Sequence, residues 1–474
     1  MKGLVALLVV ATVASCAPAL PAVPKNPAPA LPSTFGGASE ESAARIPWRE
    51  LFTEPALAAL ISEALSHNTD LEIALQRIEL ARASVFGASG ARLPTVALSV
   101  GAGVRRFGDY TMDGAGNAAT EIRPGERVPE NYTELSLGLQ ATWEIDLWKR
   151  YGALSGAARA RYLASVEGAN LVVTTLVAQV ATDYMQLVAF DRTRDILAQS
   201  IERQEEALSM MRVEKSAGRA NELAVKQFEG QLFVSRVLLA RATQERDAQE
   251  NELDAVVGRP PQPITRAATA LDAEAAPLSA GLPAELLANR PDVRAAEQEL
   301  AASQFDVRSA RAAFYPHVQI SAGIGYAAFD PRFLFRTPAS IVYNLAAGLI
   351  APLVNRRGIE SAFAAASALQ KAALFRYQGV VLKGVAEVAT ALGAVTSTNE
   401  IVQHQESRRD AMAGSVDVAD ALFRAGKATY LEVLLAQQNT RDAELELVTA
   451  RRDHQLARIQ LYRALGGGWR SSSR

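Results

Sequence analysis

The residues of this 474-residue chain that could do chemistry are few and lie far apart. The chain has one cysteine, Cys16, so it can form neither an intramolecular disulfide nor a cysteine-based metal site. No histidine is paired with another at the spacing of metal ligands; the four are His67, His317, His404 and His454. Gly101-Ala102-Gly103 lacks the third glycine of a nucleotide loop, and no serine stands in a nucleophile elbow. We therefore expect no enzyme activity, no metal and no cofactor.

The overall composition excludes some kinds of partner. Charged residues make up 21% of the chain and the formal net charge is −2, which argues against nucleic acid as the main partner. Hydrophobic residues make up 49%, yet no uninterrupted apolar run reaches about 18 to 20 residues, the length of a membrane-spanning helix. The sequence therefore predicts no spanning helix.

Cys16 stands where a bacterial lipoprotein carries its lipid. Met1-Lys2 and the apolar residues 3–11 have the charge and hydrophobicity of a short signal peptide. Val13-Ala14-Ser15-Cys16 then resembles a lipobox. We expect residues 1–15 to be removed and Cys16 to be lipidated. The alternative is an ordinary signal peptide with a chance cysteine.

The residues after the cysteine indicate where the lipid goes. Ala17 is not the aspartate that favours retention in the inner membrane, so the resemblance to lipoproteins indicates the outer membrane of a Gram-negative bacterium. Several acyl chains anchor a protein firmly where one is marginal. Residues 16–45 are rich in proline and alanine and are predicted to be a tether.

Two similar turns between long helical patterns form a second candidate site. Ala217-Gly218-Arg219 and Ala425-Gly426-Lys427 each place a small residue, a glycine and a cation before a new helix. They are 208 positions apart, the difference between 425 and 217. The cations also have a structural interpretation, because the helix dipole favours positive charge at a helix C-terminus. The repetition predicts a duplicated helical hairpin.

Strand patterns separate these helices from shorter helical segments nearer the start of each half. Apolar residues alternate with small or polar ones in four segments, which are 96–104, 135–145, 318–326 and 343–351. A period of two predicts strands, paired as hairpins over about 93–146 and 314–352. One face of these strands is apolar, and the other carries Gly, Ser, Thr and Glu. That contrast indicates a lipid-facing outside and a wet interior.

The two halves of the chain repeat the same order of elements. Pro94 and Pro316 precede the hairpins, 222 positions apart, and Gly258 and Gly466 end the last helices, 208 positions apart. We divide the chain into a first repeat over 46–258, a linker over 259–282, a second repeat over 283–467 and a tail over 468–474. Each repeat is a helix, a β-hairpin and a very long helix, which runs for about 100 Å in the first repeat.

Both the strands and the long helices require several copies of the chain. Four strands cannot close a barrel, and every strand edge in lipid must be paired. The long alanine-rich helices likewise require neighbours along their length. The sequence predicts a mainly α protein with a membrane β-barrel part that several protomers share.

The order, spacing and duplication of its elements make the chain resemble the TolC-like outer-membrane factors. Its lipobox places it nearest the OprM/NodT-type efflux lipoproteins. The residues that carry the resemblance over about 46–467 include Trp48-Arg49-Glu50-Leu51-Phe52, Asp70-Leu71, Leu93-Pro94, Trp143-Glu144-Ile145-Asp146-Leu147-Trp148, Asn289-Arg290-Pro291-Asp292-Val293, Tyr315-Pro316, Ala425-Gly426-Lys427 and Ala464-Leu465-Gly466-Gly467. The resemblance implies a homotrimer with an α-helical tunnel and a shared twelve-stranded barrel. It further implies the exit duct of a tripartite efflux pump, which passively conducts small molecules such as drugs. Its implied partners are a periplasmic adaptor and an inner-membrane RND-type transporter.

The resemblance also assigns roles to the two turns, which would lie at the periplasmic tip of the tunnel. The implied adaptor contacts are Gly218, Arg219, Gly426 and Lys427. Leu431, Glu432 and Leu435 would narrow the tip in three copies, with Glu432 giving cation preference and the leucines closing the pore. Family members often carry an acid in a Leu-Leu-Asp-Ala-Gln run, whereas residues 434–438 here are Leu-Leu-Ala-Gln-Gln. Glu432 also has a plain interpretation as a solvated helix acid.

Two other functions stay open at this point. One is a secretion duct for polypeptides within the same family, although the lipid anchor favours efflux. The other is a periplasmic coiled-coil scaffold lipoprotein without a pore, against which the two strand pairs argue.

Overall fold

The computed structural model describes residues 17–24, 26–35, 42–272 and 278–470. The predicted lipid site at Cys16 lies outside these described residues. The chain forms two compact units, and each draws on both sequence repeats. The first comprises Met1–Lys25, Leu80–Tyr162 and Glu299–Leu374, and the second Asn26–Glu79, Leu163–Gln298 and Phe375–Arg474.

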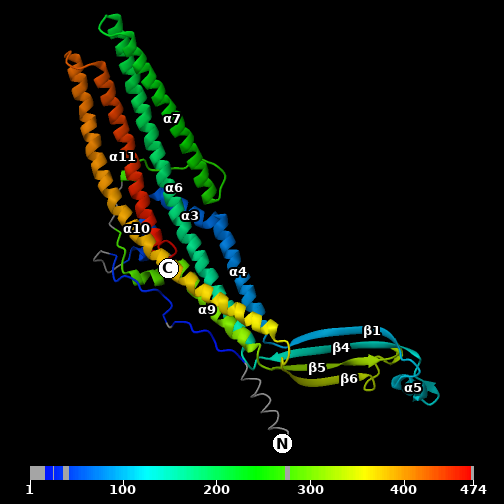
Figure 1. The fold of residues 1–474 in the computed structure, drawn as a ribbon. Coiled ribbons are helices and arrows are strands. Elements are labelled where there is room, and N and C mark those ends of the chain that lie inside the picture. Colours follow the sequence, from blue (N-terminus) through cyan, green and yellow to red (C-terminus); the bar gives the residue numbers. More distant parts are fainter. Residues whose placement is uncertain (1–16, 25, 36–41, 273–277, 471–474) are drawn as a thin grey trace. The chain divides into compact units, whose positions relative to one another are not determined.

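The first unit contains the four predicted strands as one antiparallel sheet (Figure 1). They are β1 (Thr95–Arg106), β4 (Asn131–Ile145), β5 (His317–Ala328) and β6 (Ile341–Ile350), in the order β1-β4-β5-β6. The two hairpins are joined side by side by the pairing of β4 with β5, in which Leu139 faces Ile324. Within the protomer, β1 and β6 each keep one unpaired edge.

The apolar face of this sheet is exposed in the protomer. The register aligns apolar residues across all four strands, as in Leu98 opposite Leu139 and Ile324 opposite Tyr343. Leu98 is 68% exposed and Leu345 is 78% exposed. An extended apolar face of this kind is not stable in water, and it matches the alternation of a membrane strand. The prediction of four strands with one apolar face is confirmed.

The segment between β1 and β4 holds elements that the sequence pattern did not indicate. Helix α5 (Met112–Ala119) is capped by Thr111, whose hydroxyl accepts a hydrogen bond from the Gly114 N–H at 3.0 Å. The short strands β2 (Glu121–Arg123) and β3 (Glu126–Arg127) then pair with each other. Elements of two to eight residues are too short to produce a readable hydrophobic period.

The backbones of β4 and β5 approach closely where Gly138 faces Gly325. A Cβ atom at Gly325 would lie 2.4 Å from the Leu137 carbonyl oxygen and 2.5 Å from the Gly138 Cα. We expect Gly325→Val to destabilise the sheet by about 1–3 kcal/mol, because the backbone must shift to admit the side chain. The measurement is the temperature at which the oligomer dissociates in detergent.

The matched control for this prediction is Gly348→Val in β6. A Cβ atom at Gly348 meets no atom of the protomer within 4 Å. The Gly325 variant should therefore dissociate at a lower temperature than the Gly348 variant, and equal dissociation temperatures would contradict the close approach.

The second unit is helical. Long helices that extend into it are α6 (Arg150–Ser216), α7 (Glu222–Val257), α10 (Arg357–Arg424) and α11 (Tyr430–Ala464). Shorter elements are η1 (Ala43–Arg45), α2 (Trp48–Leu51), α3 (Pro55–His67), α4 (Thr69–Gly90), η2 (Ala270–Asp272), η3 (Pro283–Glu285), α8 (Leu286–Asn289) and α9 (Pro291–Ala312). Helices α4, α6, α9 and α10 run across the boundary between the units. The predicted long helices and their hairpin order are confirmed.

The main hydrophobic core lies around the middle of α6 and the end of α11. Tyr184 of α6 is fully buried, and Tyr462 of α11 is 1% exposed. The Tyr462 hydroxyl donates to the Ile46 carbonyl at 2.6 Å, and its ring meets Phe52 edge-on. Ile46 and Phe52 are therefore fixed to the last helix.

The end of the segment predicted as a tether is packed. Ala43 and Ala44 are buried against Leu286, Val388 and Leu461. The described residues 17–24 and 26–35 contain no helix or strand.

In both repeats a side chain donates a hydrogen bond to a backbone carbonyl near the end of the last helix. The Asn68 side-chain N–H donates to the Val256 carbonyl near the end of α7 at 2.8 Å. In the second repeat the Arg290 guanidinium donates to the Ala464 carbonyl at the end of α11 at 2.7 Å. Positions 68 and 290 differ by 222, and positions 256 and 464 differ by 208. The internal duplication is thus also visible in single hydrogen bonds at equivalent positions of the two repeats.

Helices α6 and α10 are long and apolar enough to cross a membrane by length and composition alone. The expectation of no spanning helix rested on unbroken apolar runs, which is a stricter criterion. Buried core helices of soluble proteins also pass the looser test. We assign the membrane to the strands, because their apolar face is exposed and continuous.

Candidate functional site: the two helix-hairpin tips

The tips are the turn from α6 to α7 and the turn from α10 to α11, and their backbones are the same. Gly218 has φ +74° and Gly426 has φ +69°, the left-handed region in which glycine carries no Cβ penalty. The Arg219 N–H donates to the Glu214 carbonyl and the Gly218 N–H to the Lys215 carbonyl. Lys427 and Gly426 repeat both bonds to Leu422 and Phe423. Each helix therefore ends in a Schellman motif, as the small-Gly-basic pattern indicates.

The second tip begins its new helix with a capping box. The Thr429 N–H donates to Glu432 Oε2 at 2.6 Å, and the Thr429 hydroxyl lies 2.9 Å from the same oxygen. These bonds hold the pKa of the Glu432 carboxyl below its ordinary value, the backbone N–H being the larger cause. Glu432 is therefore charged at neutral pH and fixed in direction. The Thr-x-x-Glu spacing is the signal that could have predicted this role from sequence.

The first tip is held by ion pairs instead. Lys215 pairs with Glu222 across the turn, and Lys226 pairs with Glu229 at 2.8 Å. The hydrogen bond and charge of Lys215 lower the pKa of Glu222. Asn221 caps α7 by accepting from the Ala224 N–H at 2.9 Å. The two tips thus have the same backbone conformation and differ in the arrangement of their charged side chains.

The two predicted docking cations differ in their surroundings. The Arg219 guanidinium lies 2.6 Å from the Glu214 carboxylate, so its charge is partly neutralised. Lys427 is exposed, and no acidic side chain in the described part of the chain pairs with it. The charge of Lys427 is therefore more available to a binding partner than that of Arg219.

The predicted gate leucines lie one helical turn apart on α11. Leu431 is 44% exposed and Leu435 is 46% exposed, whereas Leu434 between them is buried. Leu434 packs against α6 and α7 residues such as Leu208 and Val225, which joins the two hairpins. Leu431 and Leu435 therefore share the face of α11 that is left open in the protomer.

Sequence reasoning missed one related side chain. Leu223, which is 59% exposed, is the second residue of α7 and stands at the position equivalent to Leu431, since 431 minus 208 is 223. The repeat offset was the signal that could have found it. The described residues hold no group of three or more His, Cys, Asp or Glu side chains that could bind a metal ion.

A sheet with an exposed apolar face and two unpaired edges, joined to duplicated helical hairpins, defines the protomer of an oligomeric membrane channel. Comparison with known proteins agrees with that class. The family model described as outer membrane efflux protein matches residues 60–259 and 282–467, and the chain belongs to this family. It is a TolC-like outer-membrane efflux channel.

Named relatives cover most of the chain. It is 30% identical over 425 residues to the pyoverdine export outer membrane protein OpmQ of Pseudomonas aeruginosa, covering 90% of this chain and 88% of OpmQ. It is 30% identical over 428 residues to the cation efflux system protein CusC of Escherichia coli strain K12, covering 89% and 88%. A crystal structure of CusC matches with a TM-score of 0.82 at 26% identity, covering 96% of this chain and all of that one.

Proposed function

We propose that three copies of this chain form one passive exit duct for small molecules, without enzymatic activity of its own. The observation that supports it best is the four-stranded sheet with an apolar face and open edges at β1 and β6. Three such sheets joined edge to edge make twelve strands and leave no edge in lipid. The strands lie in the outer membrane, and the helices line a tunnel through the periplasm.

The shared barrel has a direct chemical test. Within one protomer β1 and β6 are separated by two strands, so their backbones are about 14 Å apart, too far for a disulfide. A chain carrying Val100→Cys and Leu345→Cys, or Val100→Cys and Leu349→Cys, can therefore cross-link only between protomers. We expect at least one pair to give a ladder of covalent species that ends at the trimer on a non-reducing gel.

Other cross-linking results would count against this assembly. A ladder that stops at the dimer or continues past the trimer contradicts the shared twelve-stranded barrel. A chain with Val100→Cys alone is the control, because its single introduced thiol cannot build a closed ring.

The same proposal places the tips at the periplasmic partners. A periplasmic adaptor docks on Gly218, Arg219, Gly426 and Lys427 and links the duct to an inner-membrane RND-type transporter. Leu431, Glu432 and Leu435 form the constriction. Cys16 carries the lipid anchor. The named relatives serve pyoverdine export and cation efflux, and the substrates of this duct are small molecules such as drugs.

The docking role of the tips predicts a difference between their two cations. We expect Lys427→Glu to weaken binding of the adaptor at least tenfold, because the exposed ammonium is free to meet an acidic partner. Arg219→Gln should weaken it less, since Glu214 already neutralises Arg219. Surface plasmon resonance with the adaptor of the same pump measures both, and equal effects would contradict the assignment.

A polypeptide secretion duct of the same family and a poreless scaffold of a different class are the alternatives. The exposed apolar sheet face argues against the scaffold, because a soluble coiled-coil protein has no use for it. The duct for small molecules is retained as the proposal.

A further inference from the structure

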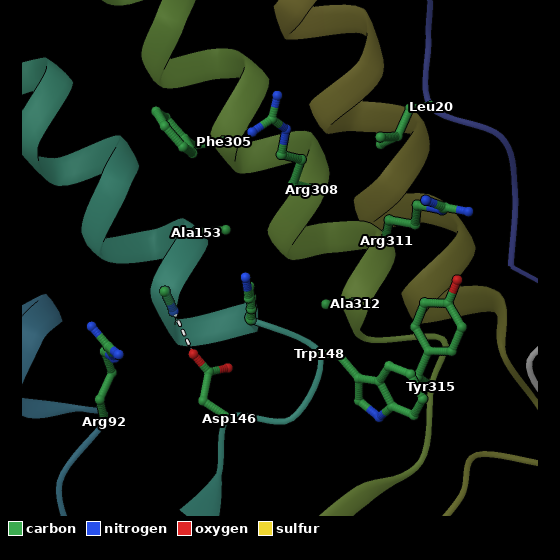
Figure 2. Close-up of a pocket in the computed structure, with 12 residues that line it drawn as sticks. Leu20, Arg92, Asp146, Trp148, Ala153, Phe305, Arg308, Arg311, Ala312 and Tyr315 are labelled. Atoms are coloured by element: carbon green, nitrogen blue, oxygen red, sulfur yellow. Dashed lines mark hydrogen bonds between the residues drawn. The ribbon is translucent and has the colours of Figure 1, made fainter. Parts of the chain in front are cut away.

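A cavity of about 650 Å³ lies where the strands meet the helices of the first unit. It is at the end of the sheet where β1 and β5 begin and β4 ends. Its lining is strongly cationic: Arg92, Lys149, Arg308 and Arg311 line it, and Asp146 is the one acid among its lining residues. Figure 2 shows Arg308 and Arg311 on α9, above Asp146 and Trp148 of the turn that leads into α6.

The one acidic lining residue, Asp146, already accepts hydrogen bonds from the backbone. Asp146 accepts hydrogen bonds from the Tyr151 N–H at 3.0 Å and the Gly152 N–H at 2.7 Å, so it caps the start of α6. It stays near the cations but points its oxygens at the helix backbone. The lining therefore has a formal charge of +3, the sum of four cations and one carboxylate.

The four cations have no ion-pair partner in the described part of the chain. Arg308 lies over the Phe305 ring at 5.4 Å, and no described carboxylate is paired with it. The Nε of Arg311 is buried and has no hydrogen-bond acceptor. Four like charges around one cavity concentrate a positive potential, which an anion relieves. Arginine forks match the oxygens of a phosphate group especially well.

The surroundings are those of a membrane interface. Trp148 stacks on Tyr315 with ring centroids 4.7 Å apart, and its indole N–H donates to the Pro316 carbonyl at 2.6 Å. Tryptophan and tyrosine beside basic residues at the ends of membrane segments mark the level of lipid headgroups. Leu20 also lines the cavity, four positions after Cys16. Four extended residues span at most about 14 Å, which limits the chain length between Leu20 and the proposed lipid site.

We infer that this cavity binds the phosphate group of an anionic phospholipid in the periplasmic leaflet of the outer membrane. The inference rests on the proposed function in one respect, namely that the strands lie in the membrane and the helices in the periplasm. Basic pockets at membrane interfaces hold anionic headgroups in this way. The bound lipid would neutralise the arginines and fix the turn between sheet and helices.

The test compares the full-length channel with variants of the pocket and a matched control. Channels carrying Arg308→Gln and Arg311→Gln together, and separately Arg92→Gln, are placed in nanodiscs of phosphatidylglycerol or phosphatidylcholine. Native mass spectrometry then counts the lipids that each channel retains. Arg159→Gln is the control, since Arg159 is an exposed cation on α6 that does not line the cavity. In parallel, the same channels are titrated with inorganic phosphate alone.

We expect the wild type and Arg159→Gln to retain phosphatidylglycerol over phosphatidylcholine. The double variant should lose that preference at least tenfold, and Arg92→Gln in part. A wild type without the preference, as when a neighbouring protomer fills the cavity, would overturn the inference. So would a double variant that keeps it. Inorganic phosphate that binds as tightly as the lipid would overturn the lipid as the source.

Conductance of the same samples separates this inference from the proposed function. A wild type that conducts but shows no preference among lipids refutes the lipid site and leaves the duct intact. A wild type that does not conduct refutes the duct, whatever lipid it retains. Arg92→Gln changes a single exposed side chain, so it keeps the lipid test decisive if the double variant does not fold.

Discussion

Replacing Glu432 by glutamine is expected to remove most of the cation preference of the channel while leaving the tip folded. Glutamine can still accept from the Thr429 N–H, so the capping box survives and only the charge is lost. Three carboxylates around a constriction set ion preference, so the permeability ratio of K⁺ to Cl⁻ should fall several-fold toward unity. The reversal potential in a KCl gradient across a planar bilayer measures this ratio.

The matched control for Glu432 is Glu222→Gln. Glu222 also stands in the first turn of a tip helix, but Lys215 already neutralises it. Its replacement should leave the reversal potential nearly unchanged. An unchanged reversal potential in the Glu432 variant would remove that residue from the gate and leave it only its capping role. Glu432→Ala is less informative, because it removes the cap together with the charge.

The same selectivity should persist in mild acid. Within each protomer, hydrogen bonds from Thr429 lower the pKa of Glu432 below the ordinary 4.5, which favours the charged carboxylate above that pH. The cation preference should be the same at pH 7 and pH 5.5, and it should fall only as the pH drops through the lowered pKa.

Replacing Arg290 by methionine is expected to cause the largest loss of stability in the helical unit. Its guanidinium is 7% exposed and contacts Asp292 at 2.6 Å, Glu387 at 2.8 Å and the Ala464 carbonyl at 2.7 Å. Methionine fills a similar volume but leaves two carboxylates and a helix-end carbonyl without this donor. Removing one partner of a buried ion pair costs about 3–5 kcal/mol. Partial exposure of the carboxylates favours the lower end of that range.

Thermal unfolding followed by circular dichroism measures this loss. Arg45→Met is the control, because Arg45 is 60% exposed and its pair with Glu285 should contribute less than about 1 kcal/mol. The Arg290 variant should unfold well below the Arg45 variant. Equal unfolding temperatures would show that the contacts of Arg290 do not hold the helix ends together.

Much of the fold could be predicted because its signals are local and repeated. The strict alternation in residues 96–104 and 343–351 depends only on the period of two. The offsets of 208 and 222 then assign each element a partner in the other half. The short α5 and the pairing of β4 with β5 gave no such signal, since one is only eight residues long and the other joins strands from different repeats.

The site could be predicted less completely, because its chemistry depends on contacts across elements. The contact of Glu432 that the sequence could have predicted is local, namely the capping box with Thr429 that the Thr-x-x-Glu spacing indicates. Leu434 and Leu435 are adjacent and chemically identical, and only packing against α6 and α7 buries one and exposes the other. The cationic cavity joins residues about 160 positions apart, such as Lys149 and Arg308.

The most direct test of the whole account is the conductance of the purified full-length chain in a planar lipid bilayer. Material that runs as a heat-modifiable trimer should give discrete conductance steps with a preference for cations. A folded, heat-modifiable trimer that inserts and gives no conductance would contradict the duct and favour the poreless scaffold.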